Sequence, residues 1–105
     1  MIYEMRDYDM LPGMTRRVLD RFGNTHSALF KKHGIRPVGF WTESIGDSSK
    51  FHFMIAGESH EERLTKWGTF REDPVRLAAL DAEPDQTVAR FHNSIWTPTS
   101  FSPLP

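Results

Sequence analysis

A strand runs directly into a helix in the stretch Lys50-Phe51-His52-Phe53-Met54-Ile55-Ala56-Gly57-Glu58-Ser59-His60-Glu61-Glu62. Apolar residues occupy both sets of alternating positions before the helix, so both faces of this strand are apolar. Ser59 and Glu62 have the spacing of a capping box, in which a serine and a glutamate three residues later satisfy the first backbone N–H groups of a helix. The stretch therefore predicts a strand over residues 50–58, a helix after Ser59, and a sheet that is apolar on both sides.

The same signals, read outward from this stretch, predict the remaining elements. In chain order these are a strand over 1–10, a helix over 14–33 with a cap at Gly34, strands over 35–46 and 50–58 joined by the turn Asp47-Ser48-Ser49, a helix that restarts at Asp73-Pro74, and a strand over 88–96. Glycine at position 23 should weaken or bend the first helix. This order predicts an α+β protein with the ferredoxin-like βαββαβ topology, in which both helices cover one face of a four-stranded antiparallel sheet.

The second apolar face of the sheet needs a cover of its own. Aromatic residues make up 12% of the chain although only 38% is hydrophobic, and they fall on both faces of the expected strands. Large exposed apolar patches are rare on monomers. We therefore expect a two-fold homodimer, with residues 1–105 as a single domain and residues 98–105 as a Pro-rich tail.

Composition excludes several classes of function. A net charge of −1 argues against binding nucleic acid through its phosphates, and the absence of cysteine excludes disulfides and cysteine-ligated metal. No apolar run is long enough to span a membrane, and the first residues do not resemble a signal peptide. We expect a cytoplasmic protein without a metal or other cofactor.

Four segments resemble the NIPSNAP family. These are Ile2-Tyr3-Glu4-Met5-Arg6-Asp7-Tyr8 with Pro12-Gly13, Gly39-Phe40-Trp41-Thr42-Glu43-Ser44-Ile45-Gly46, residues 59–74 with Glu62-Arg63, Trp67, Phe70 and Asp73-Pro74, and Thr97-Pro98-Thr99-Ser100-Phe101-Ser102-Pro103-Leu104. The resemblance implies a dimeric α+β barrel, in which two ferredoxin-like sheets pack face to face. Animal members are associated with mitochondria, but the chain shows no Arg/Ser-rich transit extension, so we expect a bacterial cytoplasmic protein. The resemblance implies no particular reaction, since the relatives of this barrel include cofactor-free monooxygenases, lactone isomerases and haem-binding enzymes.

Two histidines are the candidate catalytic residues. His52 and His92 lie in strands that flank the first strand in this topology, so they share one face of the sheet about 10 Å apart. Histidine near its reference pKa is suited to general acid–base catalysis. A hydrogen-bonded histidine of a half-buried sheet is the alternative for each.

The candidate binding residues are aromatic or cationic. They are Tyr3, Arg6, Trp41, Trp67 and Arg90. Tyrosine and tryptophan can form the walls of a small-molecule pocket, and arginine can hold a carboxylate. The alternatives are that Trp67 only anchors its helix and that the arginines form salt bridges at the dimer edge. His26, on the apolar face of the first helix, either reaches a cavity between helix and sheet or is a core histidine.

Charge is divided between the two helical regions. Residues 14–33 carry a net charge of +4 and residues 58–85 a net charge of −4. The two regions either attract each other or form docking surfaces, for dimers in a higher oligomer or for a partner. Three classes of function remain open on these residues: a small-molecule enzyme or binder with a pocket between sheet and helices and cofactor-independent acid–base or oxygenase-type chemistry, a non-catalytic dimerisation module, and a haem-binding protein.

Overall fold

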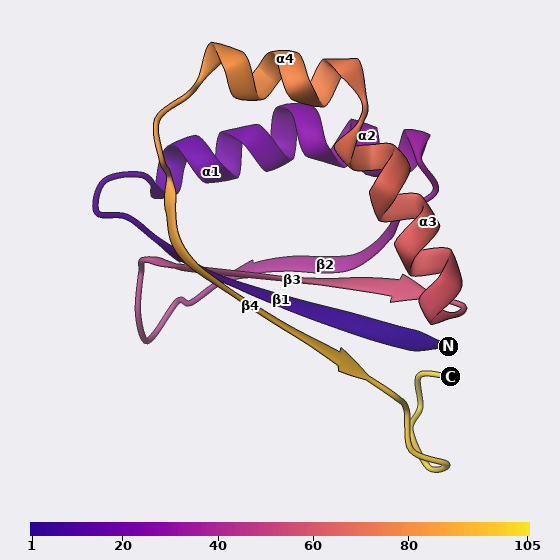
Figure 1. Ribbon diagram of the computed structural model, residues 1–105. Helices are drawn as coiled ribbons and strands as arrows, with labels where there is room; N and C mark the ends of the chain where they lie inside the picture. Colours follow the sequence, from indigo (N-terminus) through magenta and orange to yellow (C-terminus); the bar gives the residue numbers. More distant parts are fainter.

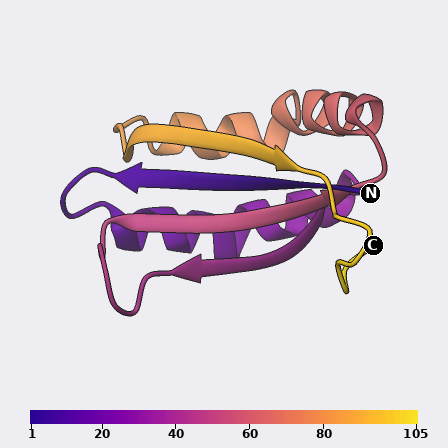
Figure 2. The ribbon, with the colours of Figure 1, turned by 90° about the horizontal axis from the view of Figure 1, so that it is seen from below.

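Four antiparallel strands form one sheet in the order β2-β3-β1-β4. The computed structural model describes all residues, 1–105, and its strands are β1 (Ile2–Met10), β2 (Arg36–Thr42), β3 (Lys50–Gly57) and β4 (Val88–Trp96). Figure 2 shows this order from the side of the sheet that carries no helices. The ferredoxin-like α+β fold predicted from the sequence is confirmed, including the position of β1 between β3 and β4.

The helices all lie on one face of the sheet (Figure 1). They are α1 (Thr15–Arg21), the π-helical segment η1 (Phe22–His26), α2 (Ser27–Lys32), α3 (His60–Arg71) and α4 (Pro74–Ala82). The predicted caps are present, since Ser59 accepts a hydrogen bond from the Glu62 backbone N–H at 3.1 Å and Asp73 accepts one from Val75 at 2.8 Å. No helix has both the length and the apolar character that crossing a membrane would require.

The helix expected over residues 14–33 is interrupted by the π-helical turn η1. Gly23, Asn24 and Thr25 are weak helix formers, so the widened turn costs little there. Ser27 closes the turn, because both its backbone N–H and its hydroxyl donate to the carbonyl oxygen of Phe22. The predicted irregularity at Gly23 is therefore a defined turn, of a kind that often occurs at functional sites.

Strand β2 is shorter than the strand predicted over residues 35–46. It ends at Thr42 because the next side chain, Glu43, turns the chain by accepting a hydrogen bond from the Asp47 backbone N–H at 2.9 Å. Ile45, which the longer strand would have placed on a sheet face, lies in this loop with 96% of its surface exposed.

The hydrophobic core lies between the sheet and the helices. Its most buried side chains are Phe30, Phe51, Phe53 and Val18. Tyr8 at the centre of β1 packs edge-on against Phe53 and Phe91 at ring-centroid distances of 5.3 and 4.7 Å. The core residues that the strands contribute alternate along β1 and β3, whereas the edge strands β2 and β4 are mostly exposed.

The opposite face of the sheet has no helix over it, and we call it the open face (Figure 1). Its large apolar side chains are Tyr3, Met5, Trp41, Met54 and Trp96. Trp41 is 47% exposed and Trp96 is 48% exposed. Both faces of the sheet are thus apolar, and helices cover only one of them. On the open face Tyr3 is buried and donates a hydrogen bond to the C-terminal Pro105, whereas the two tryptophans stay half exposed.

Candidate functional site

A cavity of about 390 Å³ lies between the sheet and the helices, on the side of the strands opposite to the open face. Aromatic rings form most of its wall, contributed by Tyr8, Phe22, Phe30, Phe53, Trp67, Phe70 and Phe91. Its volume is within the usual range for small-molecule sites. An apolar wall of flat rings suits a ligand with a flat apolar body.

The polar residues of this cavity are cationic or neutral. They are Arg6, His26, Arg63, Arg71, Arg76 and Asn93, and no aspartate or glutamate lines the cavity. Arginine forms strong hydrogen bonds with carboxylates, so those of the four arginines that have no carboxylate partner would favour a negatively charged ligand here.

Two of these arginines are held by a buried carboxylate, Glu4, whose exposed fraction is 2%. Arg63 donates to both oxygens of Glu4, at 2.9 and 3.0 Å, and the Trp67 indole N–H donates to it at 3.1 Å. Arg6 lies 3.9 Å from Glu4 and stacks over the Trp67 ring at 4.6 Å. Burial alone would raise the pKa of Glu4, but the hydrogen bonds and charge of Arg63 hold it below its usual value.

The other two arginines, Arg71 and Arg76, form no ion pair. Arg76 donates to the carbonyl oxygen of Arg71 at 3.0 Å and lies over the Phe70 ring at 5.4 Å. Burial and the neighbouring Arg71 cation lower its pKa. Arg76 is thus a half-buried cation whose charge no carboxylate of the chain compensates.

His26 reaches the cavity from the end of η1. Its ring packs between Phe22 and Phe70, with centroid distances of 4.7 and 5.5 Å. Burial lowers the pKa of His26 to about 4, and the positive charges of Arg21 and Arg76 act in the same direction. The imidazole is therefore uncharged at neutral pH.

A second cavity of about 370 Å³ adjoins the first and shares with it Tyr8, Phe22, His26, Arg76 and Phe91. Three buried side-chain nitrogens of the chain have no hydrogen-bond partner, and they are Arg21 Nε, His26 Nε2 and Arg76 Nε. All three belong to residues that line this second cavity. Buried polar groups are normally paired, so these nitrogens mark a place where a polar ligand or water would be bound.

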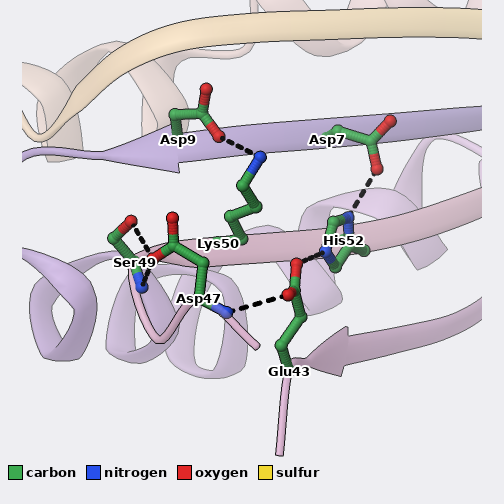
Figure 3. A network of polar contacts seen from close by, with 7 residues as sticks. All are labelled: Asp7, Asp9, Glu43, Asp47, Ser49, Lys50 and His52. Carbon is green, nitrogen blue, oxygen red and sulfur yellow. Dashed lines mark hydrogen bonds and ion pairs between the residues drawn. The ribbon is translucent and has the colours of Figure 1, made fainter. Parts of the chain in front are cut away.

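The candidate catalytic histidines lie on the open face instead. His52 and His92 both pair in register with Asp7 of β1, one from each neighbouring strand. Figure 3 shows His52 between two carboxylates, with Nδ1 at 2.5 Å from Asp7 and Nε2 at 2.8 Å from Glu43. These hydrogen bonds, that with Asp7 first, raise the pKa of His52.

The candidate binding residues divide between the two faces. Arg6 and Trp67 belong to the cavity, as described above. Tyr3 and Trp41 lie on the open face, where the Tyr3 hydroxyl donates to the Pro105 carbonyl oxygen at 2.8 Å. Arg90 is exposed and pairs in register with Asp9 on that same face. No three His, Asp or Glu side chains converge in an arrangement that would hold a metal ion.

Sequence reasoning missed Arg63, Arg71 and Arg76 as site residues. A signal for the first two exists, because Arg63, Trp67 and Arg71 are spaced by four residues and therefore share one face of α3. The net negative charge of residues 58–85 drew attention away from this basic helix face, although no acidic side chain of the region lines the cavity.

The NIPSNAP family model matches residues 3–103 of the chain. A NIPSNAP family protein of unknown function from Agrobacterium tumefaciens is 27% identical, with a TM-score of 0.87 over 100% of this chain and 94% of that one. An uncharacterised NIPSNAP domain protein from Burkholderia xenovorans is 21% identical, with a TM-score of 0.83 over 98% and 99% of the two chains.

A more distant solved structure shares the fold alone. It is a putative antibiotic biosynthesis monooxygenase from Nitrosomonas europaea, 12% identical, with a TM-score of 0.67 over 93% of this chain and 98% of that one. No curated protein matches the chain. The function of this site must therefore be inferred from its own residues.

Proposed function

This chain belongs to the NIPSNAP family, whose solved relatives include proteins of unknown function, and we propose from the residues of its cavity that it binds a small aromatic carboxylate between the sheet and the helices. The carboxylate of the ligand pairs with Arg76, and its ring packs among Phe22, Phe70 and the neighbouring aromatic side chains. Arg6 and Trp67, candidate binding residues from the sequence, belong to this proposed site.

The observation that supports this proposal is the set of unpaired groups in the cavity. Arg76 has no carboxylate partner, and its Nε and the His26 Nε2 are buried without hydrogen bonds. A bound carboxylate would satisfy the guanidinium and compensate its charge, and such charge-assisted hydrogen bonds are among the stronger ones in proteins.

Calorimetric titration with benzoate and with benzamide tests the proposal. The two molecules have nearly the same shape, but only benzoate is an anion, so we expect benzoate to bind and benzamide to bind at least tenfold more weakly. The Arg76→Gln variant should weaken benzoate binding about tenfold or more, since a hydrogen bond to a charged group contributes about 1.5–3 kcal/mol. Arg16→Gln, at an 86% exposed helix position, is the matched control and should bind as the parent does.

Equal affinity for benzoate and benzamide would overturn the charge-based recognition. If neither compound nor any other aromatic carboxylate binds, the non-catalytic dimerisation module becomes the better description of this protein.

We also propose that two copies pair through their open faces, which would give the dimeric barrel expected from the sequence. The exposure of Trp41 and Trp96 beside half-buried Met5 and Met54 supports this pairing. In such a dimer the cavities stay outside the interface, because they lie on the helix side of each sheet. A bacterial cytoplasm is the proposed compartment, and the bacterial sources of the matched structures support it.

A further inference from the structure

His26 is the one group of the cavity whose chemistry ligand binding alone does not use. Its imidazole is neutral, its Nε2 is buried without a partner, and two aromatic rings fix its plane. A neutral imidazole beside a bound molecule is suited to accept a proton from it.

The charged groups around His26 come from every element packed against the cavity. They are Arg21 from α1, Arg63 and Arg71 from α3, Arg76 from α4, Arg6 from β1 and Asp85 from the segment before β4, with the phenol of Tyr8 from β1. Five of these charges are positive, and Asp85 carries the one negative charge. A bound anion would therefore oppose the field that weakens His26 as a base, so the imidazole becomes more basic when the ligand is present.

We propose that His26 is a catalytic base that interconverts the keto and enol forms of an aromatic 2-oxo acid bound in this cavity. This inference rests on the proposed function, since the carboxylate of the 2-oxo acid takes the place of the aromatic carboxylate beside Arg76. A 2-oxo acid has two oxygen acceptors, its carboxylate and its ketone. Arginines from two elements line the cavity, Arg76 on α4 and Arg6 on β1, and Arg6 Nε also donates to Asn93 Oδ1 at 3.3 Å.

The proposed reaction needs no oxidant, reductant or co-substrate. His26 Nε2 accepts the proton from the carbon between the ketone and the ring, and the C–H electron pair forms the carbon–carbon double bond of an enolate. The negative charge moves to the ketone oxygen, where the arginines stabilise it. The imidazolium then returns the proton to that oxygen, which gives the enol, and the reverse sequence gives the ketone.

Phenylpyruvate is the probe for this activity, with benzoate as an unreactive ligand. We expect the protein to accelerate ketonisation of enol-phenylpyruvate, followed by ultraviolet absorbance, and to exchange the benzylic hydrogens for deuterium in D2O, followed by NMR. The His26→Asn variant should lose about 100-fold or more of the rate, as removal of a general base does, and should lose less benzoate affinity than Arg76→Gln does. His60→Asn, at an exposed helix end, is the control and should keep both properties.

A second readout does not depend on turnover. In an NMR titration the ring protons of His26, assigned by their loss in His26→Asn, should titrate at a higher pH when benzoate is bound than in the free protein. An unchanged titration would overturn the proposed coupling between anion and base.

The outcomes separate this inference from the proposed function. If phenylpyruvate and benzoate bind but the keto–enol rate is unchanged, or if His26→Asn keeps the full rate, the catalytic role of His26 is wrong and the binding function stands. If neither ligand binds, both fail.

Discussion

At the scale of a single residue, the buried carboxylate of Glu4 holds side chains that line the cavity. It is almost fully buried, it accepts hydrogen bonds from Arg63 and Trp67, and it forms an ion pair with Arg6. The sequence places Glu4 in the first strand, but its partner on α3 depends on how that helix packs, which no local pattern encodes.

The Glu4→Gln variant should therefore unfold far more easily than the parent protein. Removing one charge of a buried pair leaves the other uncompensated, so we expect the free energy of unfolding to fall by about 3 kcal/mol. Urea denaturation followed by tryptophan fluorescence measures this change. Glu58→Gln breaks an exposed pair with Arg36 and should cost less than about 1 kcal/mol; equal losses in the two variants would contradict the role given to Glu4.

His52 should make stability depend on pH near neutrality. Its pKa is raised in the folded protein by Asp7 and Glu43, so its protonated form stabilises the fold fully below its ordinary value of about 6.5. This contribution is lost as the pH rises through the higher folded value. The melting temperature should thus fall between pH 6 and pH 8 more steeply in the parent than in His52→Asn, and parallel profiles would exclude the effect.

The row formed by His52, Asp7 and His92 shows what strand patterns can predict. Side chains alternate with a period of two, and the βαββαβ order sets which strands are neighbours, so both histidines could be placed on one face before the structure was known. Which face holds the cavity depends on helix packing. The site also includes residues from the helices, namely Arg71, Arg76 and His26. Strand patterns do not predict how helices pack, so they could not predict that these side chains meet at one cavity.

At the scale of the element, glycines 23 and 34 have opposite roles in the first helical region. Gly23 lies in η1 with a negative φ and nothing within 4 Å of an added Cβ, whereas Gly34 has a φ of 70° and ends the helix. The sequence predicted the cap at Gly34 because a basic turn precedes it. It predicted the weak point at Gly23 but not its π-helical form, which the closing hydrogen bonds from Ser27 to Phe22 define.

Alanine at these two positions should change stability with opposite sign. Gly23→Ala should raise the free energy of unfolding by up to about 1 kcal/mol through helix propensity. Gly34→Ala should lower it by about 1–2 kcal/mol, since a side chain is strained in the left-handed region. Chemical denaturation of both variants against the parent measures the difference, and a loss of stability in Gly23→Ala would show that the π-helical turn itself requires glycine.

At the scale of the whole molecule, the open face is the surface through which we propose that two copies pair. Met5 and Met54 are register partners at its centre. We expect the parent protein to sediment at micromolar concentration with twice the mass of one chain. Met54→Glu should reduce this to a single-chain mass, because a buried carboxylate without a partner is costly.

The control for this experiment is Leu64→Glu, which places the same charge at a 62% exposed position on α3. It should leave the mass unchanged. A parent protein that sediments as one chain would contradict the proposed pairing directly.

The edge strand β2 limits any further growth of such an assembly. Pro37 has no N–H to donate, and the register of β2 with β3 shifts between Pro37 and Gly39. A strand edge with a proline and an irregular ladder is a poor template for another strand. Strand addition at the β2 edge is therefore disfavoured, so the pairing proposed for the open faces would not extend into a fibril through this edge.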